Sequence, residues 1–217
     1  MNDDLTKQFA AIVTANGVTG DVVSPPDLGS LAAVAHLCHE NEVAISLTCG
    51  APSTHQNAPK GGIVISVHRL NDVTVAPAGL TVRAAAGATV AQLRDAVAAE
   101  KLAIVGLSAQ TGSGHVGTLI ARGDVPRRSL AGVEAVLTTG ETVKAGGGML
   151  KDVVGYDLLA ALLGSAGHLA IVAAVTFRLE PAAARTATAK PPGARTWQPG
   201  LADAFDPKRL LRSGASR

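Results

Sequence analysis

Aromatic side chains make up only 2% of this 217-residue chain, which has one Trp, one Tyr and three Phe. Proteins that bind single-stranded nucleic acid stack the bases on aromatic side chains, so this scarcity argues against that class. The interior must be filled mainly by Ala, Val, Leu and Ile, because 47% of the residues are hydrophobic. A chain of this length and composition can bury a sizeable core, in one domain or in two small lobes.

Cysteine is also scarce, since Cys38 and Cys49 are the only two. They are too few for a disulfide framework and lack the spacing of metal ligands, so we expect no metal site and a buried, structural Cys38. The formal net charge is only +2. Seven Lys and Arg stand against two Asp after Glu180, so the basic excess lies in the C-terminal tail.

Long hydrophobic runs are absent as well. Asp3 and Asp4 lie in the first nine residues, and no long apolar stretch follows them, in contrast to a signal peptide. No uninterrupted apolar run is long enough to span a membrane. We therefore expect a cytoplasmic protein without a membrane span.

The first part of the chain alternates helices and strands. Apolar residues at helical spacing predict a helix before residue 19, and a short strand is expected at 21–24. Asp27 is placed to cap a helix that extends through Cys38, and the next strand is expected at 43–48. A strand, a helix and a strand in this order favour a right-handed parallel connection.

A loop of small residues, Cys49 to Asn57, follows the second of these strands. Small residues let successive backbone N–H groups approach a phosphate, and the hydroxyls of Ser53 and Thr54 could add donors. Gly50 is the only glycine, and Pro52 removes one N–H donor. From the residues alone, phosphate binding and an ordinary polar connection are equally good interpretations.

Later segments predict two hairpins and further helices. The hairpins are expected at 73–85 and 131–145, with Thr89 capping a helix between them. Glycines at 112, 114 and 117 lie around the start of an apolar helix, expected from Val116, whose N-terminal N–H groups would favour an anion. The same glycines satisfy G-x-G-x-x-G, but the surrounding strand, helix and acidic residue of a dinucleotide fingerprint are not visible, so that signal is weak.

Residues 151–177 predict a helix, a turn and a strand. They contain K-x-x-x-G-Y-D-L from Lys151, then a Gly-Ser-x-Gly turn from Gly164, then L-x-I-V from Leu169. This combination resembles the flavin domain of FAD-linked oxidases of the vanillyl-alcohol-oxidase/PCMH type. Residues 22–50 are similar to the opening of that family, 116–121 to its A-T-I-G-G-M-I-A segment, and 204–210 to its F-D-P-K ending.

The resemblance implies an α+β fold of the PCMH type, with a small parallel βαβ lobe and a second lobe built on a mixed or antiparallel sheet. We expect the lobes at about 1–70 and 71–180, followed by a basic, Pro- and Ala-rich linker and tail at 181–217. Residues 181–200 have no apolar period and are interpreted as linker or disordered. The cap or substrate domain that the family carries before its F-D-P-K ending is absent.

The cofactor implied by the resemblance is FAD. Members that attach flavin covalently from the first loop have His at the position of Ser53, so noncovalent binding is expected here. The implied FAD-binding residues are Gly50, Ala51, Pro52, Ser53, Thr54, His55, Gly112, Gly114, His115, Val116, Gly117, Thr118, Ile120, Gly167 and Ile171.

Within the family, the sequence resembles the FAD-binding subunits of bacterial glycolate oxidases. This implies an oxidoreductase acting on CH–OH donors such as 2-hydroxy acids, completed by a second flavin subunit and an iron–sulfur subunit. No catalytic residue is implied, because catalytic side chains commonly come from the missing domain.

Two other functions remain open. Pro52, Thr118 and the loop at 122–128 depart from the family pattern, which makes a cofactor-free scaffold or regulatory subunit the main alternative. A hydrolase using Ser108 or Ser113 is a weak third hypothesis, because no strand-to-helix nucleophile elbow is visible.

Overall fold

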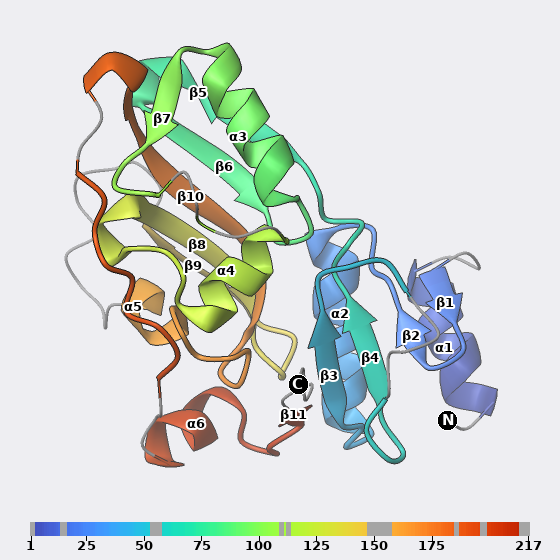
Figure 1. The fold of residues 1–217 in the computed structure, drawn as a ribbon. Helices are drawn as coiled ribbons and strands as arrows, with labels where there is room; N and C mark the ends of the chain where they lie inside the picture. Colours follow the sequence, from blue (N-terminus) through green and yellow to red (C-terminus); the bar gives the residue numbers. More distant parts are fainter. Residues whose placement is uncertain are drawn as a thin grey trace.

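The computed structural model describes two α+β lobes side by side, which confirms the predicted fold class (Figure 1). The described residues are 3–13, 17–52, 58–108, 111, 114–146, 158–184, 187–195 and 199–212. Several residues singled out above lie outside them, namely Ser53, Thr54, His55, Gly112, Ser113 and the motif at 151–157.

The first lobe is a sheet with strand order β1-β2-β4-β3-β11 and the helices α1 and α2. Strands β2, β4, β3 and β11 are parallel to one another, and the strand–helix–strand pattern predicted this orientation for β2 and β3. The antiparallel pairing of β1 with β2 and the addition of β11 were not predicted. The elements are α1 (Asp3–Val13), β1 (Val18–Thr19), β2 (Val22–Val23), α2 (Leu28–Glu40), β3 (Ile45–Thr48), β4 (Ile63–Ser66) and β11 (Leu211–Arg212).

Helix α2 begins where the sequence predicted. The Oδ1 atom of Asp27 accepts a hydrogen bond from the backbone N–H of Ser30 at 2.7 Å. This satisfies one of the N–H groups that a helix start leaves without a partner. On the buried face of α2, Leu31, Val34 and Cys38 pack into the core of the first lobe, and burial raises the pKa of the Cys38 thiol to about 12.

The second lobe is a sheet with strand order β5-β6-β10-β8-β9, and β7 also pairs with β10. Both predicted hairpins are confirmed, as β5 with β6 and as β8 with β9. The strands are β5 (Val73–Ala76), β6 (Thr81–Ala85), β7 (Leu102–Ile104), β8 (Leu130–Val136), β9 (Thr142–Gly146) and β10 (Ile171–Pro181). Short 3₁₀ turns lie at Pro77–Gly79, Arg127–Ser129 and Ala182–Ala184.

Helices α3 and α4 cover one face of this sheet (Figure 1). Helix α3 (Val90–Ala99) begins with the predicted cap, because Thr89 and Gln92 form a reciprocal capping box. Helix α4 (Val116–Arg122) ends at Gly123, which has a left-handed backbone. The helix α5 (Leu158–Leu162) also packs into this core.

The two lobes share part of one core. Val136, Ile171 and Ala173 of the second sheet belong to the buried cluster built around α2 and the first sheet. The turn between β8 and β9 also touches α2, because a Cβ atom at Gly140 would lie 2.6 Å from the Cβ atom of His36. The lobes therefore pack against each other through apolar contacts.

The C-terminal segment returns from the second lobe to the first. Residues 187–195, which we call the strap, run along the second lobe and donate backbone hydrogen bonds to the carbonyls of Gly106, Gly123 and Gly164. The strap leads to α6 (Pro199–Phe205) and then to β11, which pairs with β3 (Figure 1). A segment that composition predicts as linker and tail thus supplies an edge strand of the first sheet.

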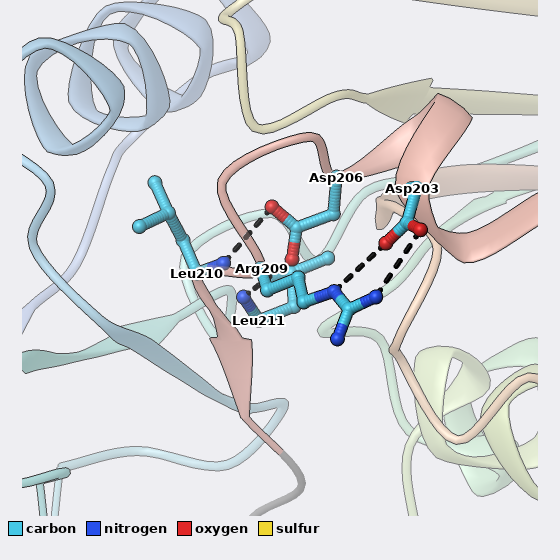
Figure 2. Close-up of polar contacts among 5 residues, drawn as sticks. All are labelled: Asp203, Asp206, Arg209, Leu210 and Leu211. Carbon is cyan, nitrogen blue, oxygen red and sulfur yellow. Dashed lines mark hydrogen bonds and ion pairs between the residues drawn. The ribbon is translucent and has the colours of Figure 1, made fainter. Parts of the chain in front are cut away.

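A buried carboxylate holds the turn before β11 (Figure 2). Asp206 is only 4% exposed, and its two oxygens accept the backbone N–H groups of Leu210 at 2.9 Å and Leu211 at 2.8 Å. Nearby, Arg209 forms an exposed ion pair with Asp203 at 2.8 Å. Asp206 therefore determines where β11 begins. No helix among the described residues is long and apolar enough to cross a membrane.

We expect Asp206→Asn to lower the free energy of unfolding by about 2–3 kcal/mol, because an amide cannot accept both buried N–H groups. Chemical denaturation measures the change. The matched control is Asp203→Asn on the same turn, which should cost little because its ion pair is exposed. Equal losses in the two variants would contradict this role of Asp206.

Candidate functional site

A cavity of about 360 Å³ lies between the two lobes. The first sheet contributes the end of β3 and the second lobe contributes α4, the turn before β10 and the start of β10. The strap and β11 each add one residue. The lining residues are Leu47, Thr48, Cys49, Val67, Gly117, Thr118, Ala121, Arg122, Ser165, Ala166, Gly167, Ala170, Ile171, Val172, Ala194 and Arg212.

Four residues from two separate predicted flavin segments meet in this cavity. Gly117 and Thr118 come from α4, and Gly167 and Ile171 come from the turn before β10 and its first residue. The other predicted residues that the structure describes do not line it. Val116 and Ile120 are in the core of the second lobe, while Gly50, Ala51, Pro52, Gly114 and His115 lie in the segments that follow β3 or precede α4.

In the first turn of α4, backbone N–H groups donate hydrogen bonds to carbonyls elsewhere in the chain. The N–H of Val116 donates to the carbonyl of Ala88 at 2.9 Å, and that of Gly117 donates to the carbonyl of Ala86 at 2.8 Å. These two N–H groups are therefore not available to an anion, in contrast to what the sequence suggested. The contacts instead fix α4 against the segment directly after β6.

Gly117 is one of the positions where the two lobes pack closely against each other. A Cβ atom there would lie 2.7 Å from the Sγ atom of Cys49 and 3.0 Å from the Cβ atom of Ala86. Burial raises the pKa of the Cys49 thiol, although hydrogen bonds with Thr118 oppose the shift. Cys49 is thus a neutral packing group at neutral pH rather than a thiolate nucleophile.

Gly50, near the start of the small-residue loop, accepts a hydrogen bond from a buried hydroxyl. The Oγ atom of Ser66 donates to the carbonyl of Gly50 at 2.6 Å and lies 2.9 Å from Nδ1 of His68. Since a hydroxyl has one proton, Nδ1 of His68 must be the donor in the second contact. Ser66 is fully buried, so its hydroxyl is not accessible to a substrate as a nucleophile. The Ser–His pair instead stabilises the position of the loop.

Two histidines lie close to this loop. His115 immediately precedes α4, and its Cε1 atom would lie 3.6 Å from a Cβ atom at Gly50. Burial, together with the nearby charges of Arg69 and His115, lowers the pKa of His68 below its ordinary value of 6.5. His68 is therefore neutral at physiological pH.

Sequence reasoning missed the two cations of the cavity, Arg122 and Arg212. Arg122 directly follows the predicted 116–121 segment, so its position offered a signal. Arg212 offered none, because its place depends on the return of β11 to the first sheet. Among the described residues, no group of three or more His, Cys, Asp or Glu could hold a metal ion.

The lowered pKa of His68 predicts a loss of stability in acid. As the pH falls below about 6.5, the unfolded chain takes up a proton before the folded chain does, so the free energy of unfolding decreases. We expect His68→Asn to remove this component, because its amide can still donate to Ser66 but does not titrate. Denaturation at pH 7.5 and 5.5 compares the two proteins, and parallel pH curves would contradict the prediction.

Comparison with known proteins identifies the family. The family described as FAD binding domain matches residues 21–146. An uncharacterized FAD-linked oxidoreductase of Mycobacterium tuberculosis is 32% identical, over 82% of this chain and 46% of its own length. The glycolate oxidase subunit GlcD of Bacillus subtilis is 26% identical, over 82% of this chain and 39% of its own length. The chain thus spans less than half the length of these relatives.

Solved structures agree on the fold. An alkyldihydroxyacetonephosphate synthase matches with a TM-score of 0.66 and 14% identity, over 83% of this chain and 42% of its own. At this identity the match concerns architecture alone, and it confirms the PCMH-type arrangement of two lobes. The family match covers more than half of the chain and includes β3, the small-residue loop and α4. The chain belongs to the FAD binding domain family of FAD-linked oxidoreductases, and its cofactor is FAD.

Proposed function

We propose that this chain holds FAD noncovalently in the cavity between its lobes, as the FAD-binding part of an oxidoreductase that acts on a 2-hydroxy acid. The observation that carries the proposal is the meeting of two predicted flavin segments in one cavity, through Gly117 and Thr118 on one side and Gly167 and Ile171 on the other. The names of the relatives, an FAD-linked oxidoreductase and a glycolate oxidase subunit, support the class of reaction.

The residues of the cavity fit part of a dinucleotide. Small residues bring the backbone close to the cavity, and Thr118 and Ser165 carry hydroxyls that can bond to sugar or phosphate oxygens. The lining includes two arginines and no carboxylate, which suits an anionic ligand. The volume of about 360 Å³ is at the lower end of ligand pockets. The cavity would therefore hold one portion of FAD, with the rest along the adjoining loop.

The protein's own contribution would be binding and orientation. FAD supplies the redox chemistry when it is bound. We assign the hydroxyls of Thr118 and Ser165 to hydrogen bonding, and the apolar Ile171 and Val172 to contact with a ring face. The Ser66 hydroxyl, which bonds the carbonyl of Gly50, would hold the start of the loop in place for the diphosphate.

Other subunits would complete the enzyme. The glycolate oxidase subunit GlcD is named as one subunit of its enzyme, and this chain spans 39% of it. We propose that a partner, such as a second flavin subunit or an iron–sulfur subunit, supplies the remaining part of the active site. No catalytic residue is assigned to this chain.

The direct test is the visible absorption spectrum of the purified protein after incubation with FAD and gel filtration. We expect a retained flavin spectrum, and acid precipitation should release all of the yellow colour to the supernatant, because noncovalent contacts do not survive unfolding. Flavin in the pellet would contradict noncovalent binding. A protein that retains no FAD would instead favour the cofactor-free scaffold.

Gly50 allows a sharper test of the loop. Its φ angle is not among the positive ones, and a Cβ atom there would be 3.6 Å from Cε1 of His115, so its described neighbours leave room for a Cβ atom. We expect Gly50→Val to weaken FAD binding about ten-fold or more by keeping the diphosphate away from the backbone, equivalent to about 1.4 kcal/mol. The unfolding free energy should change much less. Fluorescence titration with FAD measures the affinity.

The control is Gly140→Ala at the turn between β8 and β9. Gly140 has a φ angle of 88° and no room for a Cβ atom beside His36. This variant should lose about 1–3 kcal/mol of stability and keep its affinity for FAD, because the turn does not line the cavity. A folded Gly50→Val protein with the FAD affinity of the wild type would show that the loop is an ordinary connection.

A further inference from the structure

The positive charges of the cavity come from both lobes. Arg122 is the last residue of α4, and Arg212 is the last residue of β11. Within the described part of the chain, neither guanidinium has a hydrogen-bond or ion-pair partner. Other arginines are engaged, for example Arg83 with Glu134 and Arg69 with two backbone carbonyls. Arg122 and Arg212 are thus free to bind an anion that enters the cavity.

The small-residue loop needs such a counter-charge. Residues 49–59 contain neither Lys nor Arg, so this loop offers only N–H groups and hydroxyls to a ligand. Cys49, where the loop begins, lines the same cavity as the two arginines. Asp and Glu are absent from that lining, so nothing there would neutralise the guanidinium groups. A doubly charged oxyanion beside the loop would find its compensating charge at Arg122 and Arg212.

The position of Arg212 is built into the fold. It follows Leu211, whose N–H is held by the buried carboxylate of Asp206 (Figure 2). Backbone pairing of β11 with β3 then places Arg212 opposite Ser46, two residues before the cavity-lining Thr48. The C-terminal strand therefore places the guanidinium-bearing residue Arg212 at the edge of the cavity, next to the end of β3.

We propose that Arg122 and Arg212 form a clamp for the diphosphate of the bound dinucleotide, one guanidinium from each lobe. The identity of the ligand rests on the proposed function, whereas the oxyanion site rests on the cavity alone. The carboxylate of an acidic substrate has related chemistry, so the experiment separates the two sources. By joining the lobes through the ligand, the clamp also makes the C-terminal strand part of the binding site.

The test measures the affinities of Arg122→Ala and Arg212→Ala for four probes. These are FAD, riboflavin, which has no phosphate, inorganic pyrophosphate, and glycolate as the carboxylate. We expect each variant to bind FAD about ten-fold or more weakly and to lose the thermal protection given by pyrophosphate, while riboflavin binding stays unchanged. The matched control is Arg209→Asn, which removes a charge three residues from Arg212 at a position that does not line the cavity. Its positive φ angle of 50° suits Asn.

Each outcome decides the proposal. Wild-type FAD affinity in both folded variants would overturn the clamp while leaving FAD binding intact. Loss of protection by glycolate with FAD affinity unchanged would assign the arginines to a substrate carboxylate and overturn the diphosphate assignment. If the wild type binds no FAD, the proposed function fails. In that case, pyrophosphate that raises the melting temperature of the wild type but of neither arginine variant would still support the oxyanion site. If pyrophosphate does not protect the wild type, the oxyanion site is overturned.

Discussion

The close contact between the end of β3 and the first turn of α4 is the constraint on which the site depends. Gly117 has no side chain, so Cys49 of the first lobe and Ala86 of the second can pack directly against its backbone. A larger residue would meet heavy atoms at 2.7 Å and 3.0 Å, and close-packed interiors do not tolerate such overlap. The missing Cβ atom at Gly117 therefore allows Cys49 of the first lobe to pack against α4 at the wall of the cavity.

This contact also changes how glycines in a flavin-like motif are interpreted. A glycine at a binding loop is usually explained by the approach of a ligand, but Gly117 is required by the protein even without one. Gly50 is the opposite case, because a Cβ atom there would meet only His115 at an ordinary distance of 3.6 Å. The absence of a side chain at Gly50 has no packing cause among its described neighbours, which leaves ligand approach as the better explanation.

Local structure was largely predictable, because it depends on neighbours in the chain. Asp27 and Thr89 cap their helices, and both hairpins form where apolar strands flank a turn. The meeting of Gly117 with Gly167 was expected only from the family resemblance, since no periodicity can bring two such distant segments together. The hydrogen bonds from the α4 N–H groups to Ala86 and Ala88 were not predictable, because they depend on the three-dimensional approach of the segment that follows β6.

The C-terminal segment shows most clearly why composition fails at long range. Alanine, proline and basic residues without an apolar period predict no core, yet the strap is held through backbone hydrogen bonds, which composition does not encode. Its glycine partners leave room for it, since a Cβ atom at Gly123 or Gly164 would collide with the carbonyl oxygen of Gly193. A few apolar side chains and one buried carboxylate then suffice to add β11 to the sheet. Because β11 is an edge strand of only two described residues, its pairing with β3 depends on Asp206 more than on its own ladder.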